Sequence, residues 1–584
     1  MRAMVCWLTV CCLAVATANG EIRVEFAMDR DPETIAPKAI MIFPENVLSL
    51  WLNALARPEA EMQRMAAETI AEAHAFDLPD IQKAKPALTK IVSAEASHSA
   101  ARFAAARALI VLDAKEAASV LFEAAQRHGS DLRQLVEPAL AKWKFEPARK
   151  IWRKRLTTPD TRQRDLILAI RSARESGDAE CVETLLAIAH DPLRPVAARF
   201  EAARAVGSLT DSGLEEEALR FGNKASVSIF DRLCEVALLD RHRTDAAQAT
   251  LLQLAQDAEP SVAAAALVSL NANDPSLVVP IAEQAMRNDD SNVRRQGVIT
   301  FVARPTPERV VVLARMLDDL HSGLRATVRE SLFRLSQTAQ LDTSIREGTS
   351  AVLASGSWRG QEQAALLLAA LDHKPAAGRL VELLESPRDE VLISAAWGLR
   401  KLAVPESLPA ILDKAFRQTE FRKKAEPRPS LDLQVGLLFE ALGLMKHAPA
   451  EELLRRYIPK DMTMGLQSRT AAIWALGHLH AGQPDEELAK LLFERLTDPS
   501  LFPPELESVR TMSVVSMARM KTRTQAEPTQ NFLFGKGPPE TMNLKIRWAL
   551  QEMTGEKFPD LKPAIVTRSG WFLEPVEVKS SERK

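Results

Sequence analysis

Apolar residues recur along most of this chain with the spacing of one helix face. After each of fifteen starting points, two apolar or small residues stand at positions +5 and +8, as at Leu267 and Leu270 or at Ile473 and Leu476. A spacing of three puts both side chains on the same face of an α-helix. The starts follow one another about every 34–35 residues, at Met62, Ala100, Asp131, Arg162, Ala197, Ile229, Val262, Val293, Thr327, Gln361, Val391, Leu433, Ser468, Val509 and Lys545.

A second apolar helix lies between successive starts, for example over 182–189, 310–317 and 380–384. The turns between helices carry Asp, Ser, Asn and Pro, as in Glu-Pro-Ser at 259–261 and Asp-Pro at 498–499. Asp, Ser and Asn cap helix N-termini, and Pro fits the first helical turn. Each period therefore predicts a hairpin of two helices.

One such hairpin cannot bury its apolar face alone, whereas stacking on its neighbours buries a continuous core. We therefore expect an all-α fold in which about 14–15 helical hairpins stack into an alpha-alpha superhelix over residues 48–556. The alternative, several independent four-helix bundles, predicts no long-range period and fits the pattern less well.

The best-preserved repeats resemble the HEAT-like family. Residues 380–391 read Leu-Val-Glu-Leu-Leu-Glu-Ser-Pro-Arg-Asp-Glu-Val and continue into Ser-Ala-Ala-Trp-Gly-Leu at 394–399, and 289–295 read Asp-Asp-Ser-Asn-Val-Arg-Arg. The short period is similar to that of the phycobilin-lyase-type HEAT repeats. The resemblance implies a HEAT-like α-solenoid of the armadillo-like helical kind and is poorly specific for function. A tetratricopeptide array has a similar period but a Trp and Tyr pattern that a chain with one Tyr cannot supply.

Residues 1–18 have the organisation of a secretory signal peptide. Arg2 supplies a positive charge, 3–15 is apolar, and Ala-Thr-Ala at 16–18 is a small-x-small cleavage site. We expect an exported bacterial protein, periplasmic or extracellular, with no stable membrane insertion after cleavage. The sequence has no Asn-x-Ser/Thr site, which favours a bacterial source. A buried N-terminal helix, and a lipoprotein or retained anchor, are the alternatives.

The segments that flank the repeats are expected to cover the ends of the array, because an exposed stacking face is a liability. Residues 19–47 form an N-terminal extended segment, with a short strand suggested at 22–26, and are expected to cap the first hairpin. Residues 557–584 contain Trp571 and several prolines and are expected to form a C-terminal cap and a frayed tail.

Composition and charge exclude several classes of protein. The chain is 46% hydrophobic and 26% charged, which supports a large folded core. Its net charge of −2 gives no general argument for nucleic acid or an anionic membrane as a partner, and we expect neither. After removal of 1–18 only Cys181 and Cys234 remain; both lie in apolar helical patterns and are expected to be small core residues.

Motifs for catalysis are scarce. The chain lacks a phosphate loop, Gly-x-Ser-x-Gly, His-Glu-x-x-His and Cys-x-x-Cys. It also lacks the His-Glu pairs with which deoxyhypusine hydroxylase, a HEAT-like enzyme that resembles this chain in its repeats, holds iron. The best metal candidate is His478 with His480, but residues two apart on a helix point to different sides, and zinc needs three or four ligands. We therefore expect no cofactor, no metal and no catalytic residue.

Basic residues gather at two places. The first is a stretch at 142–155 with two interleaved tryptophans, and the second is an insertion at 417–430. Such patches suit an acidic partner, and a solvated helix face is the alternative. Another insertion, 521–540, is rich in Pro and Gly; insertions in solenoids form loops that can bind partners. The residues predicted to bind a partner are Arg149, Lys150, Arg153, Lys154, Arg155, Arg422, Lys423 and Lys424.

The architecture predicts a non-catalytic protein–protein interaction scaffold that binds another protein along the solenoid surface. Two alternatives from other classes remain. An enzyme or enzyme-associated subunit would require His, Asp and Glu side chains that converge from several repeats. A self-assembling structural envelope protein would associate with itself in the absence of any ligand.

Overall fold

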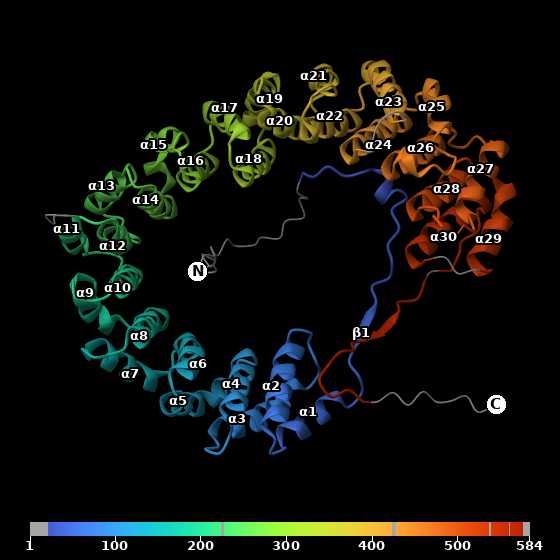
Figure 1. Ribbon diagram of the computed structural model, residues 1–584. Coiled ribbons are helices and arrows are strands. Elements are labelled where there is room, and N and C mark those ends of the chain that lie inside the picture. The colour runs from blue at the N-terminus through green and yellow to red at the C-terminus, as the bar shows by residue number, and fades with distance from the viewer. Residues whose placement is uncertain are drawn as a thin grey trace, which may run out of the picture. The chain divides into compact units, whose positions relative to one another are not determined.

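The computed structural model describes residues 22–222, 227–422, 428–500, 502–535, 539–559 and 561–575, so the predicted signal peptide at 1–18 lies outside the described residues. In the described residues thirty α-helices form fifteen consecutive hairpins, from α1–α2 to α29–α30 (Figure 1). The predicted all-α, HEAT-like solenoid of about 14–15 hairpins is confirmed, while its phycobilin-lyase-type subclass stays a prediction. None of the helices in this part of the chain combines the length and the apolar content that crossing a membrane requires.

The chain divides into two compact units, and each contains a stack of hairpins and one terminal segment. Unit 2 comprises Pro37–Arg304 and the described residues of Leu561–Lys584. Its helices are α1 Val47–Leu55, α2 Ala60–His74, α3 Lys85–Ser93, α4 Ser99–Val111, α5 Ala118–Arg127, α6 Ser130–Lys142, α7 Glu146–Thr157, α8 Gln163–Ser176, α9 Val182–His190, α10 Val196–Leu209, α11 Glu215–Gly222, α12 Ile229–Leu239, α13 Asp245–Leu254, α14 Pro260–Asn273, α15 Val279–Ala285 and α16 Ser291–Ala303.

Unit 1 comprises Pro305–Asp560 and the described residues of Met1–Ala36. Its helices are α17 Pro307–Arg315, α18 Ser322–Leu335, α19 Ala339–Ala354, α20 Trp358–Ala370, α21 Ala377–Leu383, α22 Asp389–Leu402, α23 Leu408–Arg422, α24 Pro429–Leu444, α25 Glu451–Arg455, α26 Leu466–Leu479, α27 Glu486–Thr497, α28 Glu507–Arg519, α29 Ala526–Gly535 and α30 Glu540–Thr554.

Each predicted start falls near the first residue of an even-numbered helix. The largest offsets are at Thr327 and Lys545, which lie five residues after Ser322 and Glu540, the first residues of α18 and α30. In each unit the even-numbered helices pack against one another as a row, and each also packs against the odd-numbered helix of its own hairpin. The apolar residues at +5 and +8 are buried on these sides, which is why they recur with the period of the hairpins.

The fourth residue of many even-numbered helices is an arginine that holds the preceding turn. Arg102 of α4 donates to the carbonyls of Ala94 and Glu95 at 2.9 and 3.1 Å, and Arg294 of α16 donates to the carbonyls of Asn288 and Asp289 at 2.9 and 2.8 Å. Carbonyls at helix ends lack intrahelical partners, and the guanidinium supplies donors for them. Corresponding contacts to the preceding turn or helix end are made by Arg325, Arg469 and Arg510.

The two long steps between predicted starts contain helix where we expected loops. Residues 417–422 complete α23, and 423–427 lie outside the described residues. Residues 526–535 form α29, where Pro528 occupies the first turn, in which its missing N–H is tolerated, and Leu533 is buried. The expectation of a loop is therefore wrong for 417–422 and 526–535.

The described C-terminal residues cover the first hairpin of unit 2. Strand β1 (Ile40–Ile42) pairs in parallel with β2 (Ile565–Thr567), with Ile40 opposite Ile565. Trp571 packs against the rings of Phe43, Trp51 and Phe76, with centroids 5.4, 5.8 and 5.9 Å away. Of the segment 19–47, which we expected to make this cap, residues 40–43 do lie against the C-terminal residues, whereas 22–36 belong to unit 1 and 22–26 form no strand.

Candidate functional site

The N-terminal residues 22–36, which we call the strap, cross the even-numbered helices of unit 1 (Figure 1, dark blue). The contacts follow one another along the row: Ile22 lies at α18, Met28 at α24, Asp31 at α26 and α28, and Pro32 at α30. Apart from one turn of 3-10 helix at Met28–Arg30, the strap has no regular secondary structure. Its backbone groups therefore depend on side chains of the helices for hydrogen bonds.

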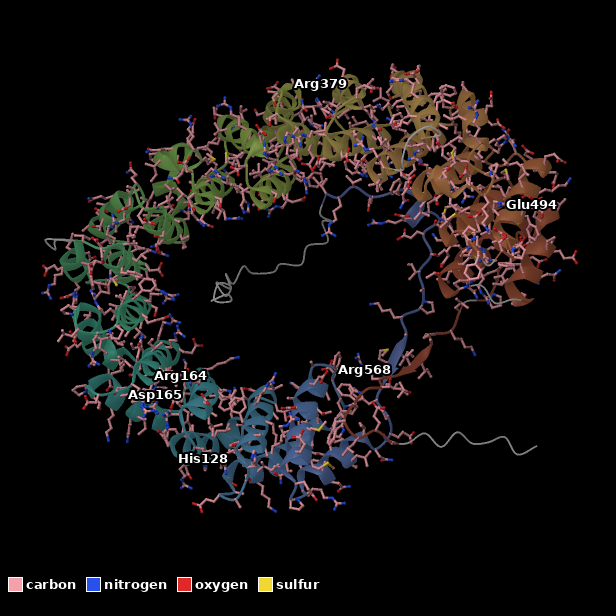
Figure 2. The ribbon with its side chains drawn as sticks, viewed as in Figure 1. His128, Arg164, Asp165, Arg379, Glu494 and Arg568 are labelled. Carbon is pink, nitrogen blue, oxygen red and sulfur yellow. The ribbon has the colours of Figure 1, made fainter. Side chains whose placement is uncertain are left out.

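The opposite side of unit 1 is formed by the odd-numbered helices. Figure 2 shows Arg379 of α21 and Glu494 of α27 on this side, away from the strap. The even-numbered side of unit 1 therefore holds a polypeptide segment, and Arg379 and Glu494 lie on the other side.

The first anchor of the strap binds both the amide and the carbonyl of Ile22. The Ile22 amide donates to Glu330 Oε1 at 3.1 Å, and Arg329 donates to the Ile22 carbonyl at 3.0 Å. Arg329 is fixed by a further bond of 2.8 Å to Gln363 of α20. Because these bonds engage the main chain, they recognise an extended segment without reading its sequence.

The second anchor buries two apolar side chains and one backbone amide. Phe26 and Met28 are 6% and 1% exposed, and the Met28 amide donates to Glu440 Oε1 at 2.7 Å. Arg400 of α22 donates to the other carboxylate oxygen of Glu440 at 2.8 Å. Burial raises the pKa of Glu440, although Arg400 and the strap amides oppose this shift. Gly436, one turn before Glu440 on α24, makes room for Phe26, because a Cβ there would lie 2.9 Å from the phenyl ring.

The third anchor is a set of donors that converge on Asp31. Trp474 Nε1 donates to Asp31 Oδ2 at 2.7 Å, His478 Nε2 lies 3.2 Å from the same oxygen, and Arg519 donates to it as well. Burial alone would raise the pKa of Asp31, but the hydrogen bonds from His478, Arg519 and Trp474 outweigh it and lower that pKa to about 2. The Lys545 ammonium donates to the next carbonyl, that of Pro32.

Helical spacing explains why the side chains that contact the strap lie on the same face of their helices. Trp474 and His478 are four residues apart on α26, as are Gly436 and Glu440 on α24. Positions separated by four residues share a helix face, so each even-numbered helix presents one short stripe to the strap. The strap then joins stripes that lie on separate repeats.

A hollow of about 380 Å³ opens beside the strap at Met28 and Asp29. The helices that line it contribute mainly polar side chains. Burial, followed by the nearby Glu25, raises the pKa of Asp29, and burial lowers the pKa of Lys545. The side chains from α26, α28 and α30 are Thr470, Glu507, Ser508, Thr511, Met512, Thr541 and Lys545.

The first group of predicted basic residues lies on α7 in unit 2, where the arginines make contacts within the chain. Arg149 donates to the Ser176 carbonyl at 2.9 Å, Arg153 pairs with Asp178 at 2.6 Å, and Arg155 pairs with the buried Glu137 at 2.7 Å. Lys150 and Lys154 are exposed. The structure therefore engages the three arginines in contacts within their own hairpin and with adjoining residues, and leaves the two lysines on the surface.

The second predicted group is only partly described. Arg422, at the end of α23, pairs with Asp432 at 3.2 Å and donates to the Met464 carbonyl, and its side chain is 7% exposed. Lys423 and Lys424 lie outside the described residues. Partner binding at these positions stays a prediction.

The two candidate histidines point to different partners, as expected from their spacing. His478 faces Asp31, whereas His480 lies 3.2 Å from Glu451. Glu451, His480 and Asp485 approach one another closely enough to suggest a metal site. Arg455 pairs with Glu451 at 2.8 Å and with Asp485 at 2.6 Å, so a guanidinium already lies between the two carboxylates and the cluster is an ion-pair network.

Sequence reasoning missed the three anchors. Arg400, Glu440 and Arg519 are charged residues in helices with long apolar stripes, and Arg400 and Glu440 are almost fully buried. A charge in an apolar stripe needs a buried partner, and this signal was available in the sequence. Arg400 and Glu440 pair with each other across 40 residues, whereas the partner of Arg519 could not be identified because Asp31 lies 488 residues away in the strap.

Neither a protein-family model nor a curated protein matches this chain. Similar solved structures include Kap95p from a study of its binding to RanGDP, with 12% identity and a TM-score of 0.49, and importin beta, with 14% identity and a TM-score of 0.49; each likeness covers 87% of this chain and 72% of the other. Kap121p bound to Ste12p is similar at 11% identity and a TM-score of 0.47, over 88% of this chain and 57% of that one. The fold assignment rests on the fifteen hairpins themselves.

Proposed function

We propose that this chain is a non-catalytic protein-binding scaffold, exported to the envelope or secreted space of a bacterium, which binds an extended segment of a partner protein. The binding surface is the row of even-numbered helices from α18 to α30. The observation that supports this proposal is the strap, because the row already holds a polypeptide segment through its backbone and its side chains.

The kinds of contact in the row favour recognition of a segment. Main-chain hydrogen bonds supply affinity, and pockets for side chains supply specificity. Ile22 and Met28 receive the first kind of contact, and Phe26 and Asp31 receive the second. The organisation of residues 1–18 supports export.

Site-specific photo-crosslinking in the native organism tests the binding surface. A photo-reactive amino acid replaces Thr541, which is exposed and lines the hollow beside the strap, and the matched control replaces Glu494, whose side chain is 64% exposed on the odd-numbered side. We expect a discrete partner adduct from position 541 and none from position 494. Equal adducts from both positions, or none from either in a correctly exported chain, would contradict the proposal.

Two further measurements test the remaining parts of the proposal. The N-terminal sequence of the exported protein is expected to begin after Ala18.

The double variant Lys150→Glu and Lys154→Glu reverses the charge of the two exposed lysines of α7. Loss of the adduct at position 541 in this variant would extend the partner's contact to α7, and an unchanged adduct would remove α7 from the binding surface.

A further inference from the structure

We infer that the Trp474, His478 and Arg519 side chains form a recognition site for the carboxylate of a partner segment that carries an aromatic residue five positions before an aspartate, and that the strap competes for this site from within the same chain. This inference rests on the proposed function and specifies its ligand. The strap is the observed example of the ligand's chemistry.

The carboxylate site is organised by the helices that carry it. Trp474 and His478 come from one face of α26, with ring centroids 4.0 Å apart, and the Arg519 guanidinium from α28 lies 5.5 Å from the Trp474 ring centroid. All three direct hydrogen-bonding groups to a single oxygen of Asp31. Hydrogen bonds that involve charged groups are stronger than neutral ones. A guanidinium that packs against an aromatic ring is held in place to bind a carboxylate.

The spacing between the two side-chain anchors gives the specificity. Phe26 fits over Gly436 and Asp31 reaches Arg519, so the site reads an aromatic ring and a carboxylate five residues apart. The Met28 amide, between them, donates to Glu440. Val24 and Arg30 of the strap are exposed, so the corresponding positions of a partner segment are free to vary.

The surroundings of Asp31 allow exchange of one segment for another. The Asp31 side chain keeps 30% of its exposure, and the serine, threonine and glutamate side chains of the hollow beside Met28 and Asp29 offer hydrogen-bonding groups to an incoming segment before the strap has left. A segment tethered to its own binding site acts at an effective concentration of order millimolar. A tethered strap therefore weakens the apparent affinity of any partner that uses the same anchors.

Peptide binding to the full chain tests the inference. The probe is a fluorescent peptide of residues 22–34, acetylated and amidated at its ends, and the readout is fluorescence anisotropy. The strap-release variant carries Phe26→Ala and Asp31→Asn in the full chain. We expect it to bind the probe at least about tenfold more tightly than the native chain does, because its own strap no longer fills the anchors.

Controls separate the carboxylate from general charge. A probe with Asp31→Asn is expected to bind the strap-release variant at least about tenfold more weakly, whereas a probe with Glu33→Gln, the same change at an exposed position of the strap, is expected to bind normally. Adding Arg519→Gln to the strap-release variant is expected to abolish binding with an unchanged circular dichroism spectrum. A full chain with Glu33→Gln alone serves as the folding control.

Three outcomes overturn the inference. They are equal probe binding by the native and strap-release chains, no probe binding by a strap-release chain that is folded, and equal binding of the native and Asp31→Asn probes by the strap-release chain. The photo-crosslinking experiment distinguishes these failures from failure of the proposed function. A partner adduct at position 541 of equal yield in native and strap-release chains would keep the scaffold and remove the competing strap.

Discussion

The two units hold terminal segments of the same chain by different kinds of contact. Unit 2 holds the C-terminal residues through three paired strand positions and an aromatic cluster around Trp571. Unit 1 holds the strap through the buried Glu440 carboxylate, guanidinium groups and an indole N–H. The first set of contacts covers one hairpin, whereas the second extends over helices from α18 to α30.

This difference distinguishes a cap from a binding site. A cap needs to exclude water from the end of a stack, and apolar rings do so with little demand on sequence. The contacts of the strap are directional, and several of them read the backbone. Directional polar contacts with buried groups discriminate among segments, because a wrong segment leaves charges unpaired.

The largest expected effect comes from Arg469→Ala in unit 1. Arg469 and Glu505 are both fully buried and joined by two hydrogen bonds of 2.8 and 2.9 Å. Removing the arginine leaves a buried carboxylate with Arg495, 3.6 Å away, as its charged partner beside the Leu506 amide at 2.9 Å, and is expected to cost about 3–5 kcal/mol of unfolding free energy. Denaturant unfolding gives the energy, and hydrogen exchange should show lost protection in α26, α28 and the strap.

The matched variant in unit 2 is Arg102→Ala, at the same fourth position of an even-numbered helix. Arg102 donates to the carbonyls of Ala94 and Glu95. Its loss is expected to cost about 1–2 kcal/mol. Equal losses of unfolding free energy in the two variants would show that the fourth helical position matters more than the buried ion pair. Such a result would weaken the contrast between the units.

The next effect is expected for Trp571→Ala. The loss of three ring contacts is expected to destabilise unit 2 by about 2–3 kcal/mol and to expose residues 561–575 to proteases. Binding of the strap peptide to the strap-release chain should not change. A parallel loss of peptide binding would contradict the assignment of the C-terminal residues as a cap.

Gly436→Ala tests how closely the strap fits its helices. The new Cβ would lie 2.9 Å from the Phe26 ring and 3.3 Å from Gln467, and the crowding is expected to cost about 2 kcal/mol. Phe26→Ala in the same chain should recover part of this cost, with a coupling of roughly 1 kcal/mol in a double-mutant cycle measured by denaturant unfolding. Gly443→Ala, whose Cβ would meet Ala475 and not the strap, is the control and should show no coupling to Phe26→Ala.

The smallest effect concerns a buried carboxyl group in unit 2. Burial raises the pKa of Glu235 to about 7 from 4.5. The folded chain therefore keeps a proton that the unfolded chain releases, so the stability falls as the pH rises from about 4.5 to about 7 and stays reduced above that range. Glu235→Gln is expected to raise the unfolding free energy by about 1–2 kcal/mol at pH 8 and by almost nothing at pH 4.

The pH dependence separates Glu235 from Glu440, its buried counterpart in unit 1. Glu440 is paired with Arg400 and accepts the Met28 amide, so Glu440→Gln is expected to loosen the strap and to give no gain at pH 8. Glu216→Gln, at an exposed position of α11, is the control for Glu235→Gln. A gain at pH 4 as large as that at pH 8 would contradict the role of the Glu235 proton.

The repeat architecture was accessible from the sequence because its determinants are local. Each pair at +5 and +8 lies within one helix, and turn residues such as Asp290, which caps α16, act within three positions. Cys181 and Cys234 are buried, as their apolar surroundings indicated, and burial raises the pKa of the Cys181 thiol to about 12. Stacked hairpins contact their neighbours in sequence, so local patterns are sufficient.

The binding site was not accessible because its determinants are distant. The pattern of basic residues on α7 showed charge but not its partners, and Arg153 and Arg155 are paired with Asp178 and Glu137 of neighbouring repeats. The strap lies 308–513 residues away from the helices that bind it. The apolar pattern of a single repeat contains no information about a contact between residues so far apart in the sequence.

The strap has a consequence for the order in which the chain matures. A ribosome makes residues 22–36 well before α30, so the bond from Lys545 to Pro32 joins two parts of the chain that are synthesised at different times. Closing so long a loop costs little more than closing a shorter one, since the entropy grows with the logarithm of length. A chain that stops before α28 leaves Asp31 without Arg519, so the third anchor of the strap is complete only after α28 has been made.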